Sequence, residues 1–394
     1  MTTGSSVPFK ILLVAEGSGG HLIPALQVAH ALANSGAQVK VWYAHRPLTA
    51  PLSSALAQAI RGGSVEVDPI PVKTASNPFG RLWQFGQLWH RAQRCFDAFA
   101  PDVVVGFGGW VSAPIVFAAC VRRATANFPW PMRRLTPRRM GCLLHEQNVM
   151  MGRANRVLAP WVDRVAVSFR ETPSRLGAAS TIITGLPTRQ QIGQSSRAEA
   201  AEQFELDPHR PTCFVLGGSQ GARAINRLMV RAVAHLSPEE QRAWQVIHLT
   251  GATDEAMVRT AYAASAIRAW VAPFLLEMEA AYAQADLVIA RAGASTIAEL
   301  AQCGKPAILI PYPYAGGHQR VNARLVETRG GGLLLEEAEA TAERLLAAIR
   351  QILSDRRLRE LMGAQMQGLH HVNATDQLAR AILDLAGRAS EAQS

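Results

Sequence analysis

The sequence is poor in cysteine, in aromatic residues and in uninterrupted apolar runs. Its five cysteines are scattered, odd in number and without a CxxC pair, so a disulfide framework and a zinc site are disfavoured and a reducing cytoplasm is indicated. The first ten residues lack the charged-then-apolar order of a signal peptide. Residues 103–121 carry no charge, but glycines and Pro114 interrupt them, so a strand, a glycine turn and a helix are expected there rather than a membrane span.

Several nucleotide-binding and metal-binding patterns are also missing. No GxGxxG fingerprint followed by an acidic residue about 20 positions later is present, and no Walker A sequence occurs. A nicotinamide-dependent dehydrogenase is therefore disfavoured. The sequence contains no DxD-like acidic pair that would suggest a metal site. We therefore expect no metal and no cofactor.

Positive charge is in excess. The chain has a net charge of +10 and a pI near 9.9, which favours an anionic partner such as nucleic acid, an acidic membrane or a phosphorylated substrate. At 394 residues and 48% apolar content the chain is long enough for two globular α/β domains.

The most informative stretch is residues 286–322, DLVIARAGASTIAELAQCGKPAILIPYPYAGGHQRVN. Apolar strands are expected at residues 287–290 and 307–310, with a small-residue turn and a helix between them. The turn meets the helix N-terminus, where open α/β sheets bind phosphate. Glu299 lies one turn into this helix, where a carboxylate can accept both hydroxyls of a ribose. An ordinary helix-surface glutamate fits the spacing equally well.

Domain one begins with a similar unit. A strand at residues 11–15 is followed by a glycine-rich turn, which contains Ser18, Gly19, Gly20 and His21, and Pro24 is predicted to start the helix. His21 is a candidate general base, although capping of the helix is an equal alternative. Another strand, 142–144, ends in His145-Glu146-Gln147-Asn148, and polar residues at the end of a strand are typical of a site in such folds.

Residues 79–99 are expected to form a helix with more bulky apolar residues than one face can hold. The predicted core stripe of this helix consists of Phe85, Leu88, Ala92, Cys95 and Phe99. Phe79, Leu82 and Trp83 project away from that stripe, so they are either buried under a neighbouring loop or exposed to a membrane or partner. The following arginine-rich segment, residues 122–140, contains no acidic residue and is a candidate membrane-surface loop.

Five segments in this order resemble the MurG family: GSGGHLIPAL, GFGGWVSAP, HEQNVMMGRAN, GGSQGARAIN and RAGASTIAEL with GHQRVNA. These enzymes are UDP-N-acetylglucosamine:N-acetylmuramyl-(pentapeptide) pyrophosphoryl-undecaprenol N-acetylglucosaminyltransferases. The resemblance covers nearly the whole chain. It implies the α/β GT-B fold, in which two Rossmann-like, doubly wound domains face a deep cleft.

The implied reaction is an inverting transfer of GlcNAc from UDP-GlcNAc to the 4-hydroxyl of MurNAc in undecaprenyl-linked lipid I, which forms lipid II for peptidoglycan. Residues 1–187 would form the acceptor and membrane domain, and residues 188–372 would bind UDP-GlcNAc. The C-terminal helix, about residues 373–394, would pack back on the first domain. The resemblance further implies a peripheral location on the cytoplasmic face of the inner membrane, no nucleic acid, and cell-wall synthesis or division proteins as candidate partners.

The resemblance also implies roles for individual residues. Glu299 would bind the ribose, the Leu275 backbone the uracil, and Ser219 and Arg189 the diphosphate side. Asn148 and His21 would reach the donor sugar and the reacting centre, with Glu146 the next candidate base. The remaining implied substrate-binding residues are Gln220, Ala294, Ser295, Thr296, His318 and Gln319.

The chain departs from the family pattern at a few positions. Glu16 replaces the usual glycine beside the anion-binding loop, and we expect its carboxylate to point away from a bound phosphate. Leu186 replaces an asparagine, Gly316-Gly317 replaces an acidic pair, and Ser18 replaces a threonine. The alternatives are another GT-B enzyme acting on a UDP-sugar, such as a UDP-GlcNAc 2-epimerase, and a non-catalytic lipid-binding or scaffold protein.

Overall fold

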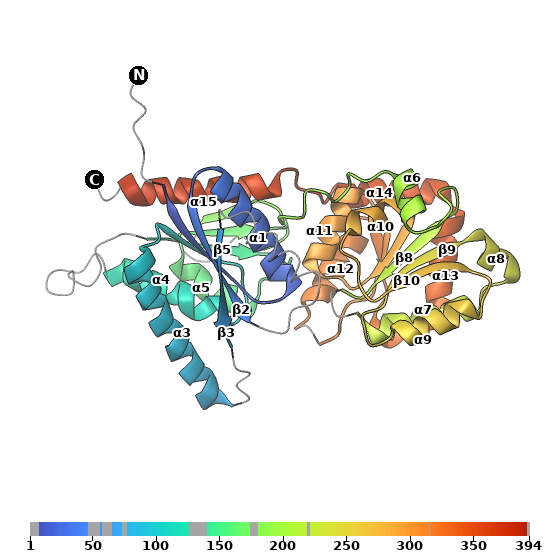
Figure 1. Cartoon of the computed structure of the whole chain (residues 1–394), viewed down its shortest axis with the longest axis horizontal. Helices are drawn as coiled ribbons and strands as arrows, with labels where there is room; N and C mark the ends of the chain where they lie inside the picture. The colour runs from blue at the N-terminus through green and yellow to red at the C-terminus, as the bar shows by residue number, and fades with distance from the viewer. Residues whose placement is uncertain are drawn as a thin grey trace, which may run out of the picture. The chain divides into compact units, whose positions relative to one another are not determined.

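The computed structural model describes residues 8–45, 56, 65–72, 77–125, 140–173, 180–218, 221–314 and 316–391. Its internal contacts divide the chain into two compact units. Unit 1 extends to Pro187 and is completed by the residues from Val372 onward, whereas unit 2 runs from Thr188 to His371. Figure 1 shows that each unit is a sheet flanked by helices.

Unit 1 is built on a parallel sheet in the order β3-β2-β1-β4-β5-β6-β7. The chain therefore reverses its direction of winding between β1 and β4, which are paired neighbours. In an open α/β sheet the loops that follow such a strand pair form the usual ligand crevice. The strands are β1 Lys10–Ala15, β2 Gln38–His45, β3 Val65–Pro71, β4 Val103–Gly106, β5 Gly141–Glu146, β6 Arg164–Val167 and β7 Ser180–Ile183.

Helices cover both faces of this sheet because its central strands are apolar on both sides. Ile11 and Leu13 of β1 pack in one core with α1 and α15, while Leu12 and Val14 pack in the other with α3, α4 and α5. In Figure 1 the last helix, α15, lies along unit 1 beside α1. The helices are α1 Gly19–Asn34, α3 Pro78–Phe99, α4 Ser112–Thr125, α5 Arg153–Leu158 and α15 Ala374–Glu391, with a 3-10 turn at Ala159–Trp161.

Unit 2 repeats the plan with a parallel sheet in the order β10-β9-β8-β11-β12-β13. Its winding reverses between β8 and β11, so the loops after these two strands mark its expected ligand crevice. The strands are β8 Thr212–Leu216, β9 Gln245–Leu249, β10 Arg268–Ala272, β11 Leu287–Ala290, β12 Ala307–Leu309 and β13 Gly332–Leu334.

The helices of unit 2 also form two layers. Apolar residues of α7, α9 and α13 pack on one face of the sheet. On the other face the Tyr282 ring of α10 meets the Phe214 ring of β8 edge-on. The helices are α6 Arg197–Gln203, α7 Arg223–Ala234, α8 Pro238–Ala243, α9 Glu255–Ala263, α10 Met278–Gln284, α11 Ala294–Cys303, α12 His318–Thr328, α13 Ala342–Ser354 and α14 Arg356–Gln367, with a 3-10 turn at Glu337–Glu339.

One local prediction is wrong and a second is confirmed only in part, because Leu88, Ala92 and Cys95 of the predicted α3 core stripe are buried. Helix α1 begins at Gly19 rather than at Pro24, because the Leu22 N–H already donates to the Ser18 carbonyl and closes a helical turn through the two glycines. In α3 the fully buried phenylalanine of the core stripe is Phe96, while Phe85 and Phe99 are half-buried. Among the described residues, no helix combines the length and apolarity that a membrane span requires.

Candidate functional site

The loop after β11 leads directly into α11, which has no side-chain cap at its N-terminus. Its first intrahelical hydrogen bond runs from the Ile297 N–H to the Gly293 carbonyl. The N–H groups of the first turn, on Ala294, Ser295 and Thr296, therefore have no intrahelical acceptor and favour an anion. The Ser295 hydroxyl is buried and has no hydrogen-bond partner among the described residues. These features at the switch point of unit 2 fit a phosphate-binding turn.

Glu299 lies on the next turn of α11 with only 13% of its side chain exposed. The Tyr282 hydroxyl donates to Glu299 Oε2 at 2.9 Å, and an Arg189 guanidinium nitrogen lies 3.6 Å from Oε1. Burial raises the pKa of Glu299 above 4.5, and the contacts with Arg189 and Tyr282 offset part of this rise. The carboxylate is thus held in a fixed orientation.

Arg189 joins Glu299 to the loop after β10. Its guanidinium donates to the Leu276 carbonyl at 2.9 Å. Leu275, the neighbouring residue, is half-buried in this loop. The structure therefore places Arg189 beside the carboxylate and the predicted uracil loop, and it links the two. The contact with the diphosphate that the family resemblance implies for Arg189 stays a prediction.

His318 and Gln319 form the first turn of α12, a helix that the sequence did not predict. The Tyr312 N–H donates to Gln319 Oε1 at 2.9 Å, which ties this turn to the loop after β12. Gly316 and Gly317 both have positive φ, a conformation that an acidic pair would adopt only with strain. Ser219 and Gln220 lie outside the described residues, so their predicted roles stay predictions.

In unit 1, His21 lies in the first turn of α1, at the switch point of the sheet. Its Nδ1 is hydrogen-bonded to the Ser18 hydroxyl at 2.8 Å. Gly19 and Gly20 occupy the same turn, and Gly108 of the loop after β4 leaves room for the ring, since a side chain there would meet His21 Nε2. An imidazole oriented through Nδ1 can use Nε2 to take up a proton.

Glu16 precedes this turn and fills part of the same switch point. Its side chain is buried, and Oε2 accepts a hydrogen bond from the Val111 N–H at 3.3 Å. Gly109 has a φ of +84°, and any side chain there would overlap the Glu16 carboxyl group. The carboxylate therefore points toward the loop after β4, where backbone N–H groups precede α4. It places a negative charge inside the crevice of unit 1.

Glu146 is fully buried, and both of its carboxylate oxygens are engaged. Oε1 accepts from the backbone and side-chain nitrogens of Asn148 at 2.9 and 3.2 Å. Oε2 accepts from the Gly152 N–H at 2.9 Å and from Asn155 Nδ2 at 2.8 Å. A carboxylate with four donors orders its loop and is poorly suited to take a proton from a sugar. Glu146 thus holds Asn148 in place, while the identity of the base, His21 or Glu146, stays a prediction.

Sequence reasoning missed the supports behind these residues. Tyr282 stands behind Glu299, and the buried His145 links Gln147 to the Gly185 carbonyl through bonds of 3.4 and 3.2 Å. Burial lowers the pKa of His145 to about 4, so its ring is neutral at pH 7. The position of His145 among polar residues at a strand end indicated a site, but nothing in the sequence indicated that the Gly185 carbonyl is its partner. Within the described residues, no group of three or more His, Cys, Asp or Glu could hold a metal ion.

Two Rossmann-like domains, each with polar residues in the loops at its switch point, are the arrangement of the GT-B class of nucleotide-sugar enzymes. The glycosyltransferase family 28 N-terminal domain matches residues 11–167, and the glycosyltransferase family 28 C-terminal domain matches residues 212–378. A relative from Syntrophotalea carbinolica is 35% identical over 96% of this chain and 99% of its own length. Its name is UDP-N-acetylglucosamine--N-acetylmuramyl-(pentapeptide) pyrophosphoryl-undecaprenol N-acetylglucosamine transferase. This chain belongs to that family, the MurG glycosyltransferases.

Solved structures agree with this fold. The crystal structure of Acinetobacter baumannii MurG has a TM-score of 0.70 and 26% identity, and the match covers 96% of this chain and 100% of that one. A UDP-GlcNAc 2-epimerase from Neisseria meningitidis bound to UDP-GlcNAc has a TM-score of 0.62. Its identity is 11%, with 95% of this chain and 100% of that chain covered, so this second likeness concerns the fold alone.

Proposed function

We propose that this protein transfers GlcNAc from UDP-GlcNAc to the 4-hydroxyl of MurNAc in undecaprenyl-pyrophosphoryl-MurNAc-pentapeptide, with inversion at the anomeric carbon. The observation that carries this proposal is the match, over 96% of this chain and 99% of the relative, to an enzyme named for that transfer. The product is lipid II, a precursor of peptidoglycan.

In this proposal unit 2 binds the donor. Glu299 accepts the ribose hydroxyls, and the Leu275 backbone contacts the uracil. The N–H groups of Ala294, Ser295 and Thr296 stabilise the diphosphate as negative charge grows on it. Ser219, Gln220, His318 and Gln319 complete the contacts with the diphosphate and the sugar. The main-chain N–H groups at the positive end of α11 thus stabilise the negative charge of UDP as it leaves.

Unit 1 binds the acceptor and supplies the base. His21 Nε2 takes the proton of the MurNAc 4-hydroxyl while its oxygen forms a bond to the anomeric carbon of GlcNAc. The bond from that carbon to the diphosphate oxygen breaks, and UDP leaves with the electron pair. Ser18 orients the ring through Nδ1, so it is a positioning residue. Asn148, held by Glu146, contacts the donor sugar.

The reaction is tested by incubating the protein with UDP-GlcNAc and a short-chain lipid I analogue. We expect a product one N-acetylhexosamine heavier than the acceptor, with UDP released in equal amount. A UDP-GlcNAc 2-epimerase would instead convert UDP-GlcNAc to its 2-epimer without any acceptor. Acceptor-independent epimerisation without a glycosylated product would refute the proposal.

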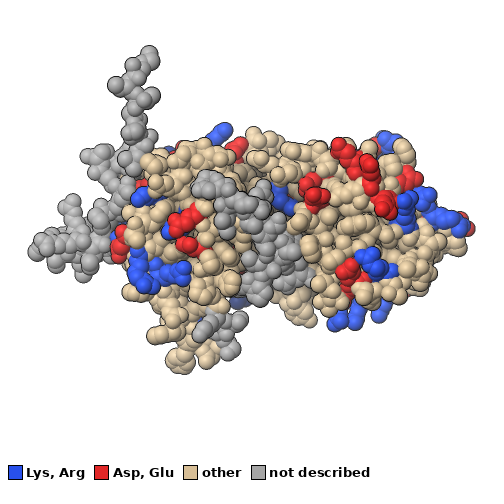
Figure 2. Space-filling view, viewed as in Figure 1, with Lys and Arg blue, Asp and Glu red and all other residues tan. Residues whose placement is uncertain are grey.

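The end of α3 supports peripheral binding to the cytoplasmic face of the inner membrane. Phe79, Leu82 and Trp83 are 84%, 71% and 72% exposed, and Gly86, Gln87 and His90 complete this surface. Figure 2 shows the end of α3 as an uncharged surface on the face in view. The arginine-rich segment 122–140 lies largely outside the described residues, and its predicted contribution of about 1 kcal/mol per cation near an anionic surface stays a prediction.

Membrane binding is tested by sedimentation with anionic and neutral vesicles. We expect stronger binding to the anionic vesicles, and weaker binding at high salt because the charges are screened. Trp83→Ser should reduce binding to both vesicle types. Trp161→Ser is the matched control, since Trp161 is also exposed on unit 1 but belongs to another surface. Equal loss in both variants would count against the α3 surface.

A further inference from the structure

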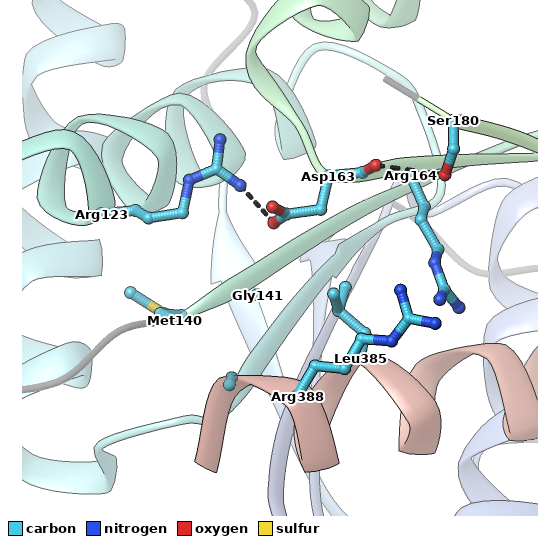
Figure 3. Close-up of a pocket in the computed structure, with 9 residues that line it drawn as sticks. Arg123, Met140, Gly141, Asp163, Arg164, Ser180, Leu385 and Arg388 are labelled. Atoms are coloured by element: carbon cyan, nitrogen blue, oxygen red, sulfur yellow. Dashed lines mark hydrogen bonds and ion pairs between the residues drawn. The ribbon is translucent and has the colours of Figure 1, made fainter. Parts of the chain in front are cut away.

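A second pocket opens in unit 1 at the amino ends of its strands. Figure 3 shows it between the beginnings of β5, β6 and β7, the end of α4 and the last turns of α15. It encloses about 290 Å³. Since the strands are parallel, this edge of the sheet is opposite the one that carries His21, Glu16 and Glu146. The pocket therefore belongs to neither the donor site nor the glycine loops of the transfer reaction.

The charged groups that line the pocket are three guanidinium groups and one carboxylate. Arg123 already has partners within the protein, because it forms an ion pair with Asp163 and donates a hydrogen bond to the Trp161 carbonyl. Asp163 is committed as well, since it also accepts a hydrogen bond from the Cys142 N–H at 2.8 Å. This pair holds the end of α4 on the sheet, and within the described residues it leaves two cations, Arg164 and Arg388, without a carboxylate.

Arg164 is half-buried. Within the described residues only one of its guanidinium nitrogens forms a hydrogen bond, which it donates to the Ala381 carbonyl of α15 at 3.2 Å. Arg388 is exposed, and the described part of the chain gives it neither a hydrogen bond nor an ion pair. In Figure 3 both guanidinium groups point into the same space above Leu385. Like charges that share a pocket repel each other, so an anion between them would lower the electrostatic energy.

The floor of the pocket is apolar and closely packed. Met140, Leu385 and Ala389 are buried, and a side chain at Gly141 would overlap Leu385. A fixed floor beneath two guanidinium forks favours a compact anion with several oxygens. Arginine binds phosphate through paired, charge-assisted hydrogen bonds, which gives such a site both strength and geometry.

We propose that this pocket binds a phosphate group between Arg164 and Arg388. The group comes either from free phosphate or from the headgroup of an anionic lipid. The chemistry is the same in both cases, because two arginines contact the phosphate oxygens while the apolar floor excludes water from one side.

The test uses the full-length protein with inorganic phosphate, at constant ionic strength maintained with chloride. Phosphate should raise the melting temperature, because it binds only the folded state. It should also slow hydrogen exchange in the last turns of α15. Arg388→Gln should weaken phosphate binding about tenfold, since it removes one charge-assisted contact. Arg380→Gln is the matched control: Arg380 is exposed on the same helix but does not line the pocket.

A second, more conservative variant keeps the proposal testable if Arg388→Gln fails to fold. Arg164→Lys keeps the charge and loses the fork, so its binding should fall between that of the wild type and Arg388→Gln. Neither arginine has a role in GlcNAc transfer, so the transfer rate measured without phosphate should not change. A failed transfer assay would therefore refute the proposed function without affecting the proposed pocket.

Vesicles of phosphatidylcholine with and without phosphatidic acid distinguish the two sources. If Arg388→Gln weakens binding to the phosphatidic acid vesicles and Arg380→Gln does not, the pocket takes a lipid headgroup. If only the binding of inorganic phosphate depends on Arg388, the pocket takes a free phosphate group. If the two variants match each other in both assays, or if phosphate protects only the donor loops, the pocket proposal is overturned.

Discussion

Glu299 offers the sharpest test of the donor site, because its carboxylate has a definite number of acceptor positions. An ionised carboxylate has about four lone-pair positions, and the structure gives one oxygen to Tyr282 and the other to Arg189. Each oxygen keeps a position for one ribose hydroxyl. We therefore expect Glu299 to bind both hydroxyls without releasing its two supports.

The magnitude follows from these bonds. A hydrogen bond to a charged group contributes about 1.5–3 kcal/mol, and water partly replaces the carboxylate when it is removed. A net loss of about 1.4–2.8 kcal/mol corresponds to a ten- to hundredfold weaker affinity for UDP and UDP-GlcNAc in Glu299→Ala. Glu299→Gln should lose less, because one acceptor oxygen remains. Either variant should also lower stability, since the buried Tyr282 hydroxyl loses its acceptor or its charged partner.

The assay is calorimetric titration with UDP and with 2′-deoxy-UDP, which lacks one of the two hydroxyls. Wild-type protein should prefer UDP, whereas Glu299→Ala should barely distinguish the two ligands. Tyr282→Phe is the control, because it removes a support but keeps the carboxylate, so it should retain the preference. If Glu299→Ala discriminates as strongly as the wild type, Glu299 does not contact the ribose and is a structural helix residue.

Three further predictions concern unit 1. His21→Ala should lower the transfer rate by about 10²–10⁴-fold with UDP affinity nearly intact, and near-normal turnover would move the base elsewhere. Glu16→Gly removes a buried negative charge from the unit 1 crevice, so the KM for the lipid acceptor should fall in steady-state assays; a KM that is unchanged or higher would contradict this. Burial lowers the pKa of His145 from 6.5 to about 4. As the pH drops below 6.5, His145 therefore binds a proton in the unfolded chain before it does so in the folded protein. The free energy of unfolding should fall over this pH range. Denaturant unfolding of wild type and His145→Gln between pH 7 and pH 4 should show a loss that is larger in the wild type by about 3 kcal/mol at most, because the buried His248 contributes equally to both proteins.

The strands and the loops of both switch points were predictable because buried apolar runs and glycine turns are local signals. The position of Phe79, Leu82 and Trp83 off the core stripe followed from the helix period, and of the two alternatives left open for them the structure shows exposure. Helix α12 was missed because its first residues follow two glycines, and glycine ordinarily indicates a turn. The cleft between the domains stays a prediction.

The contacts that organise the site could not be predicted. Arg189 reaches Glu299 and Leu276 across long intervals of sequence, and no periodicity encodes such a pairing. The orientation of Glu16 depends on the backbone of the loop after β4, where Gly109 leaves the necessary space. The roles predicted for Arg189 and Glu146 stay predictions, because residue type indicates what a side chain can do but not which partners already occupy it.

The position of α15 has a consequence for biosynthesis. Unit 2 is continuous in sequence from Thr188, whereas unit 1 needs Leu378, Ile382 and Leu385 of α15 to close one of its two cores. A ribosome delivers the chain from its N-terminus, so unit 1, although it is translated first, must wait for α15, which follows unit 2 in sequence. Until then α1 lacks the apolar side chains of α15 that pack beside it. Termination of translation between unit 2 and α15 would thus leave unit 2 intact and unit 1 prone to aggregation.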